Sequence, residues 1–324
     1  MFRKMPLFWV AVCGCTFAAQ PSGKAAGIKT PGIQIPFANL KAEAQITKAP
    51  SWITFTDGTL VADEKSLYKI DAKKNELGDP VAAVNRACGG AVNAFGSIWV
   101  PSCGDGALVR LDPKTWKVTA TVAAGVANVA GGLAASADSI WLLTDTKTTL
   151  SRIDPEKNEV VAELRLPLGC DNLAFGEGSL WVTCATEDRV LRINPATALM
   201  DKRIDVGGQP RALAIGETSV WVWCQKEGKI DRIDPKTNKV SKSIELGAPG
   251  ADGTLTIGEG SIWTSITGFP INRIDPNKEK VVQQFWGAGG GLIRFGLGSV
   301  WLSNLKEGTL WRVDPKRVAA TLAE

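Results

Sequence analysis

Residues 171–206 read DNLAFGEGSLWVTCATEDRVLRINPATALMDKRIDV and hold four short apolar runs separated by turn-forming residues. Val, Ile, Leu, Trp and Thr dominate the runs, whereas Gly, Glu, Asp, Asn, Pro and Lys fill the breaks. This pattern is typical of short β-strands joined by tight turns. We therefore expect strands at 173–175, 180–184, 189–193 and 202–206. The breaks are too short for a crossover helix, so neighbouring strands should be antiparallel.

The same unit recurs along the chain. An aliphatic residue precedes Trp at Trp99, Trp141, Trp181, Trp221, Trp263 and Trp301. A basic–aliphatic–acidic triplet, with Asn in place of the acidic residue in the fourth copy, ends at Asp71, Asp112, Asp154, Asn194, Asp234, Asp275 and Asp314, with gaps of 41, 42, 40, 40, 41 and 39 residues. A four-stranded antiparallel unit repeated at this period predicts an all-β, seven-bladed β-propeller. Because the blades must stack to bury their faces, we expect one propeller domain over residues 41–324.

The first repeat and the ring closure are less regular. Val61 takes the place of Trp in the first copy. A propeller ring must close, because an open end would expose unpaired strand edges. Residues 44–50 resemble the outermost strand of a blade, and the C-terminal residues 318–324 could fill the same place. The sequence leaves both closures open.

The N-terminus has the pattern of an export signal. Arg3 and Lys4 precede an apolar stretch at residues 5–12 and a zone of small residues, so we predict a signal peptide over residues 1–19 and no transmembrane segment. The VCGC sequence ending at Cys15 also resembles a lipoprotein signal, in which Cys15 would carry the lipid anchor. Residues 20–40 contain several Gly and Pro and are expected to form a flexible lead-in. The mature protein is expected in the periplasm or outside the cell.

Composition excludes several classes of function. The chain has 37 Lys and Arg against 33 Asp and Glu, with no clustered basic run, so nucleic acid is not an expected partner. It contains no histidine, which removes the usual general base, the Ser-His-Asp triad and the common zinc sites. No cofactor is predicted. Ca²⁺ or Mg²⁺ held by carboxylates such as Asp171 and Asp252 is the metal chemistry that the composition leaves open.

Residues that recur in every blade are interpreted as scaffold. A Trp in the middle of each second strand would pack between blades. The acidic residue before Pro would accept backbone N–H groups of the turn, and the Arg two positions earlier would tie blades together. Catalytic use of so many equivalent groups is not expected.

The cysteines depart from the repeat. Cys88 and Cys170 stand at the start of an innermost strand, and Cys103 and Cys184 stand at the end of the next strand. These ends are neighbours in an antiparallel pair, so we predict the disulfides Cys88–Cys103 and Cys170–Cys184, which export would allow to form. Cys224 has Pro210 opposite and so lacks a partner. Its use as a nucleophile is disfavoured because no His can activate it.

The mouth of the central channel is the expected functional site. The starts of the innermost strands and the loops between second and third strands converge there, and most of these positions are glycine, which lets a ligand approach the backbone and its N–H groups. Asp171 and Arg211 lie in adjacent blades and would either pair with each other or form part of a ligand site. The candidate ligand-binding residues are Trp52, Arg86, Asp171, Asn172, Arg211, Trp223, Asp252 and Arg294.

The Gly-Ser-aliphatic-Trp-Val strand, the Arg-Ile-Asp-Pro turn and the seven-fold count resemble the YVTN-type and streptogramin-lyase-like (virginiamycin B lyase-like) propellers over roughly residues 44–324. For the lyases the resemblance implies a site of histidine and metal, and no position here can inherit the histidine. We therefore favour a monomeric binding module that takes a small molecule or protein partner at the channel mouth. The alternative is a lyase or lactone hydrolase with a non-histidine, metal-assisted site, so the question of catalysis stays open.

Overall fold

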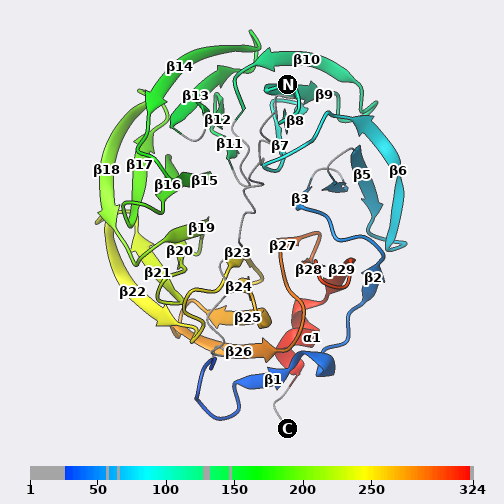
Figure 1. Ribbon diagram of the computed structural model, residues 1–324, viewed down its shortest axis with the longest axis vertical. Helices are drawn as coiled ribbons and strands as arrows, with labels where there is room; N and C mark the ends of the chain where they lie inside the picture. The colour runs from blue at the N-terminus through cyan, green and yellow to red at the C-terminus, as the bar shows by residue number, and fades with distance from the viewer. Residues whose placement is uncertain (1–25, 56–57, 64–65, 127–131, 146–147, 322–324) are drawn as a thin grey trace, which may run out of the picture.

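The computed structural model describes residues 26–55, 58–63, 66–126, 132–145 and 148–321. The predicted signal peptide, with Cys15, lies outside these residues. The described strands form seven sheets around a central axis, and within each sheet consecutive strands run from the channel outward to the rim, apart from two strands of the N-terminal segment that add to the outside of two sheets (Figure 1). The prediction of an all-β propeller is confirmed.

The innermost strands are β3 (Trp52–Phe55), β7 (Val92–Ala94), β11 (Leu133–Ala135), β15 (Cys170–Gly176), β19 (Pro210–Gly216), β23 (Gly253–Gly258) and β27 (Ile293–Gly296). The second strands are β4 (Thr59–Ala62), β8 (Ser97–Ser102), β12 (Ile140–Thr144), β16 (Ser179–Cys184), β20 (Ser219–Cys224), β24 (Ser261–Ile266) and β28 (Ser299–Asn304). The third strands are β5 (Ser66–Asp71), β9 (Ala107–Leu111), β13 (Thr149–Asp154), β17 (Arg189–Asn194), β21 (Lys229–Asp234), β25 (Phe269–Asp275) and β29 (Thr309–Val313). The outer strands are β6 (Glu76–Ala83), β10 (Val118–Ala123), β14 (Glu159–Arg165), β18 (Leu199–Asp205), β22 (Lys239–Glu245) and β26 (Lys280–Trp286).

Six of these sheets have four antiparallel strands, and the seventh departs from the predicted blade. In that sheet a fifth strand, β1 (Gln34–Pro36), pairs in parallel with β26. Residues 26–40, expected as a flexible lead-in, instead pack against the propeller. Ile35 and Phe37 are buried, and the Phe37 ring stacks on Trp311 with 4.8 Å between ring centroids. The Gly and Pro residues of this segment suggested a flexible linker, but its apolar side chains cover the rim of the β23–β26 sheet.

The ring is closed by the N-terminal side of the chain. Strand β2 (Ala44–Ile46) pairs with β29 as the outermost strand of the last sheet. The C-terminal residues form the short helix α1 (Pro315–Ala320) instead, which begins with Pro315 after the capping side chain of Asp314. The two closures left open by the sequence are therefore decided in favour of residues 44–46.

The repeated tryptophans are core residues, as interpreted. All six are at most 1% exposed. Each indole N–H donates to an acceptor five residues earlier, such as the carbonyl oxygen of Gly176 for Trp181 at 3.0 Å. In the first sheet Leu60 pairs with both Thr54 and Lys69, so Leu60 takes the register of Trp and the assignment of Val61 to that place is wrong by one residue.

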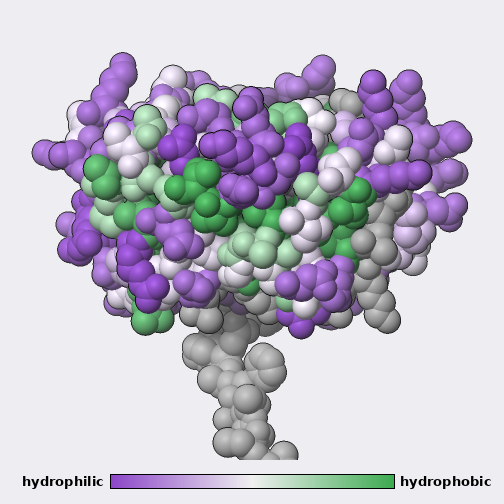
Figure 2. Space-filling view, turned by 90° about the horizontal axis from the view of Figure 1, so that it is seen from above, coloured by the Kyte–Doolittle hydropathy of each residue, from purple (hydrophilic) through white to green (hydrophobic). Residues whose placement is uncertain are grey.

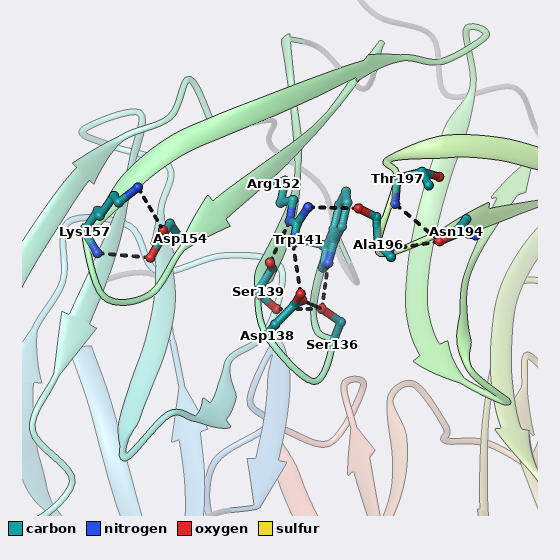
Figure 3. Close-up of polar contacts among 10 residues, drawn as sticks. All are labelled: Ser136, Asp138, Ser139, Trp141, Arg152, Asp154, Lys157, Asn194, Ala196 and Thr197. Atoms are coloured by element: carbon teal, nitrogen blue, oxygen red, sulfur yellow. Dashed lines mark hydrogen bonds and ion pairs between the residues drawn. The ribbon is translucent and has the colours of Figure 1, made fainter.

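The repeated Arg and acidic residues are also scaffold, shown for one blade in Figure 3. Asp154 accepts the backbone N–H groups of Glu156 and Lys157, which closes the turn. Arg152 binds Ser139, and one of its nitrogens donates to a carbonyl oxygen in the next blade, that of Ala196, at 3.4 Å. The interpretation of the Asp as a turn residue and the Arg as a tie between blades is confirmed.

Equivalent contacts run around the ring. Arg110, Arg192, Arg232 and Arg312 each reach the turn of the following blade. Lys69 stands in place of Arg in the first blade, and its ammonium lies 5.4 Å from the centre of the Trp116 ring in the next one. Arg273 instead binds Gln283, whose amide donates to Val318 in α1. Every interface between neighbouring blades thus has a polar or cation–π contact.

Figure 2 views the rim of the disc, where hydrophilic side chains dominate the upper and lower edges and less polar side chains form a band between them. Val118 in β10 and Val161 in β14 are about half exposed, at 51% and 47%. No helix among the described residues is long and apolar enough to cross a bilayer.

Candidate functional site

A cavity of about 550 Å³ occupies the central channel, where the innermost strands meet. Its lining combines apolar and polar side chains, as is usual for small-molecule sites. Phe55 and Phe295, near the turn ends of β3 and β27, supply the aromatic part of the wall. A Cβ atom on Gly296 would lie 2.4 Å from the Phe55 ring, so the glycine that ends β27 makes room for this aromatic residue of the next blade.

Polar side chains along the channel wall mainly satisfy the backbone. The innermost strand of each blade has one edge without a neighbouring strand, so its N–H and C=O groups need other partners. Thr54 donates to the Ala91 carbonyl oxygen at 2.7 Å, and Thr254 bonds to both Gly291 and Ile293. Asn172, a predicted ligand residue, accepts the backbone N–H of Leu213 through Oδ1 at 3.4 Å. These contacts link neighbouring innermost strands across the interfaces.

The mouth carries a chain of four polar side chains across three blades. Asp171 Oδ2 lies 2.9 Å from Arg211 Nη1, so the two residues pair, which is one of the alternatives left open by the sequence. The Nε atom of Arg211 donates to Gln225 at 3.0 Å, and the Gln225 amide donates to Asp252 at 2.8 Å. The charge of Arg211 is thus balanced by Asp171 at the rim of the channel.

A divalent metal does not fit this chain. Asp171 and Asp252 are separated by Arg211 and Gln225, both of which direct N–H donors at the carboxylates. Within the described ranges no three His, Cys, Asp or Glu side chains converge. A Ca²⁺ or Mg²⁺ ion needs several convergent oxygen ligands, which this arrangement does not supply.

Arg294 is the charged residue that lies in the channel without a carboxylate. It stands on β27 and lines the cavity. One of its guanidinium nitrogens donates to the Ile293 carbonyl oxygen at 2.8 Å, and no other partner is found for it among the described residues. Burial lowers the pKa of Arg294 to about 10. Its side chain still keeps partial exposure, as expected for a group that faces a cavity rather than a packed core.

The other predicted mouth residues lie in different surroundings. Trp52 lines the cavity and is only 4% exposed, and its Nε1 atom has no hydrogen-bond partner in the described structure. Trp223 does not line the channel: it is 1% exposed and packs in the core behind Gly253. Arg86 is exposed on the loop before β7, where it donates to the Cys103 carbonyl oxygen, and it does not line the cavity either. Trp223 and Arg86 are therefore not part of the cavity wall.

Both predicted disulfides are present. Cys88 bonds to Cys103 and Cys170 to Cys184, with Cα–Cα distances of 6.0 and 3.8 Å. Cys224 is free and buried, and its Sγ lies 3.5 Å from Oδ2 of the buried Asp231. Burial and this carboxylate raise the pKa of the Cys224 thiol. The thiol is therefore protonated near neutral pH and unsuited to nucleophilic chemistry.

Sequence reasoning missed the apolar depth of the site and its hydrogen-bonded rim. Phe55 and Phe295 were assigned no role, although the position just before the glycine that ends β15, β19, β23 and β27 is apolar in each case. Gln225, on the loop between β20 and β21, links Arg211 to Asp252, and the repeat gives no sign of this contact. The isolation of Arg294 could not be read from the sequence, because it depends on which carboxylates reach the channel.

Comparison with known proteins shows that the chain is similar to solved structures in its fold. No protein-family model matches the chain, and no curated protein matches it in sequence. Among solved structures, a streptogramin B lyase has a TM-score of 0.67 at 19% identity, covering 82% of this chain and 93% of the lyase. Virginiamycin B lyase from Staphylococcus aureus has a TM-score of 0.69 at 15% identity, with coverage of 83% and 97%. A chain of the mitotic checkpoint complex has a TM-score of 0.69 at 13% identity, with coverage of 86% and 96%. These matches show the fold alone.

Proposed function

We propose that the protein is an exported binding module that takes a small molecule into its central channel. The observation that carries the proposal is the cavity of about 550 Å³, a volume in the range of ordinary small-molecule sites, lined by both aromatic and polar groups. The side chains at the mouth are fixed by a hydrogen-bonded chain from Asp171 to Asp252, so the entrance is pre-formed. A pre-formed site loses less conformational entropy when a ligand binds.

Export is supported by the two disulfides as well as by the N-terminal sequence. Disulfides persist in oxidising compartments and are rare in the cytosol. The basic and apolar order of residues 3–12 is that of a signal peptide. The periplasm and the extracellular space are both consistent with these features, and Cys15 would decide whether a lipid anchors the protein.

A lyase activity is the second candidate, because two streptogramin-type lyases share the fold. A catalytically inactive form of the S. aureus enzyme, solved with quinupristin, has one histidine replaced by alanine. The present chain has no histidine. In addition, Asp171 is engaged by Arg211 rather than placed as a free base. The binding module therefore fits the site better than the lyase does.

The test is native mass spectrometry of the protein recovered from cells that export it. The channel is blocked in one variant by Ala214→Phe, because Ala214 lines the cavity. Ala123→Phe, at an exposed position of the outer strand β10, is the matched control. We expect the unaltered protein and the control to retain a small molecule that the blocked variant has lost.

A bound molecule that persists in Ala214→Phe would place the binding site outside the channel and contradict the proposal. Linearisation of a streptogramin B-type lactone in the presence of Mg²⁺ is measured on the same samples. Turnover by the unaltered protein that disappears in Ala214→Phe would replace the binding module with the lyase.

A further inference from the structure

Arg294 differs from the residues at the equivalent position of the other six innermost strands. In six blades the residue of the innermost strand that pairs with Trp, or with Leu60 in the first blade, is small or aliphatic. These residues are Thr54, Val92, Ala134, Ala174, Ala214 and Thr256. In β27 the residue that pairs with Trp301 is Arg294. A scaffold role would be shared by the repeat, so this single departure points to a function of the channel itself.

The contacts of Arg294 leave most of its hydrogen-bonding capacity unused. A guanidinium has five N–H donors, and the one hydrogen bond it makes among the described residues is to the carbonyl oxygen of the adjacent Ile293. Arg294 is only partly exposed, and a charged group that loses part of its hydration without gaining a protein partner is costly for the folded protein. Such a cost is expected where a ligand supplies the missing partner, because strained or unsatisfied groups concentrate at functional sites.

The charges in the cavity lining point to a single negative charge on the ligand. The charged lining residues are Asp171, Arg211 and Arg294, and the first two neutralise each other at 2.9 Å. One uncompensated positive charge therefore remains. A carboxylate matches it in charge and in the fork geometry of the guanidinium, whereas a dianionic phosphate would leave one negative charge uncompensated.

The surroundings of Arg294 indicate the rest of the ligand. Leu292, Phe55 and Phe295 line the same cavity and offer apolar and aromatic surface. This surface calls for an apolar or aromatic body on the ligand beside its charged group.

We propose that the channel binds a small organic acid, with its carboxylate on Arg294 and its apolar body against Phe55 and Phe295. This inference rests on the proposed function and adds the chemical class of the ligand. Arg294 acts as the anchor that distinguishes an acid from a neutral molecule of the same shape.

The test compares naphthoate with its neutral amide, naphthamide, by isothermal titration calorimetry. The unaltered protein should bind naphthoate at least about tenfold more tightly than naphthamide, because a charge-assisted hydrogen bond contributes more than a neutral one. Arg294→Gln should bring the two dissociation constants together. Arg86→Gln, which removes a positive charge near the mouth but outside the cavity, should keep the preference.

Arg294→Lys is the control that separates loss of the charge from loss of the fold, because it keeps a positive charge at the same position. We expect a folded Arg294→Lys protein to retain a preference for naphthoate, smaller than that of Arg294 since the bidentate geometry is lost. A preference that survives in Arg294→Gln overturns the inference, as does equal binding of the two probes by the unaltered protein. Either result leaves the channel module intact, whereas the Ala214→Phe experiment tests that module independently.

Discussion

Arg152 shows why single arginines can hold two blades together. Its Nε donates to Ser139 at 2.7 Å, another nitrogen lies 2.9 Å from Asp138, and the guanidinium stacks over Trp141 at 5.7 Å (Figure 3). Only a planar group with several donors can stack and form these bonds together. Lys69 stands at this position in the first blade, and its ammonium lies 5.4 Å from the centre of the Trp116 ring in the next blade. The Arg before the turn in the other six blades is therefore structural, whereas Arg294 lies on an innermost strand and lines the cavity.

Replacing Arg294 with Met is expected to stabilise the protein without ligand. Burial lowers the pKa of Arg294, which means that its charged form costs free energy in the folded state. The unfolded state binds this proton more tightly, so removing the group should raise the free energy of unfolding at pH 7 by about 1–3 kcal/mol. Thermal melting followed by circular dichroism measures the change, with Arg294→Lys as the charged control.

A lower melting temperature for Arg294→Met than for Arg294→Lys would contradict this prediction. It would mean that the guanidinium is a packing group of the channel wall. The anion-binding role would then lose its energetic basis, although the binding preference itself would still be decided by the calorimetric comparison.

At the scale of elements, the disulfides join strands that the propeller already holds adjacent. Cys88–Cys103 and Cys170–Cys184 close loops of 15 and 14 residues at the mouth end of two blades. Loops of this length restrict the unfolded chain and typically contribute about 3 kcal/mol each. Reduction should therefore lower the melting temperature, and the double variant Cys170→Ala/Cys184→Ala should reproduce part of the loss.

The count of reactive thiols checks the same pairing. In the protein without residues 1–19, we expect no reactive thiol in the native state because Cys224 is buried, one after unfolding and five after reduction. More than one thiol in the unfolded, unreduced protein would show that a pairing is wrong.

The Asp residues in the turns between third and fourth strands should make the stability of the protein depend on pH. Backbone N–H groups of Lys157 and Glu156 lower the pKa of Asp154, and similar bonds lower the pKa of the equivalent Asp71, Asp112, Asp234 and Asp275. A carboxyl group with a lowered folded-state pKa contributes stability that is present above its unfolded pKa and lost as the pH falls through the folded value. The melting temperature should therefore fall as the pH drops below about 4.

Asn194 occupies the same turn position without a titrating group and bonds the N–H groups of Ala196 and Thr197. Asp154→Asn should accordingly reduce the acid-dependent loss of melting temperature, while Asn194→Asp should increase it. Parallel pH profiles for both variants and the unaltered protein would disprove a contribution from these turns.

For the whole molecule, the parts that the sequence predicts are those that repeat. Trp181 and Asp154 follow from the period, and the two disulfides follow from strand register. The errors lie where one blade differs from the rest. Burial of Trp223 behind Gly253, the extra strand at Gln34–Pro36 and the missing partner of Arg294 depend on contacts between residues distant in the sequence. No period in the sequence records such contacts.

The N-terminal segment closes the ring and belongs to two blades at once. Strand β2 completes the sheet of β29, and β1 extends the sheet of β26. Gln284, fully buried, accepts the Ile28 N–H at 2.7 Å and donates to Leu246 at 3.0 Å, so the segment is also fastened to the preceding blade.

A chain that begins at residue 47 should therefore lose cooperative unfolding, because the edge of β29 and the apolar surface covered by Phe37 are exposed together. A chain that begins at residue 26 keeps β1 and β2 and serves as the control. Differential scanning calorimetry of both should show one sharp transition for the control and a broad or absent one for the shorter chain. If the shorter chain melts as sharply and at the same temperature, the remaining strands close the ring without β2, and the C-terminal residues after Val313 become the candidate for the vacated edge.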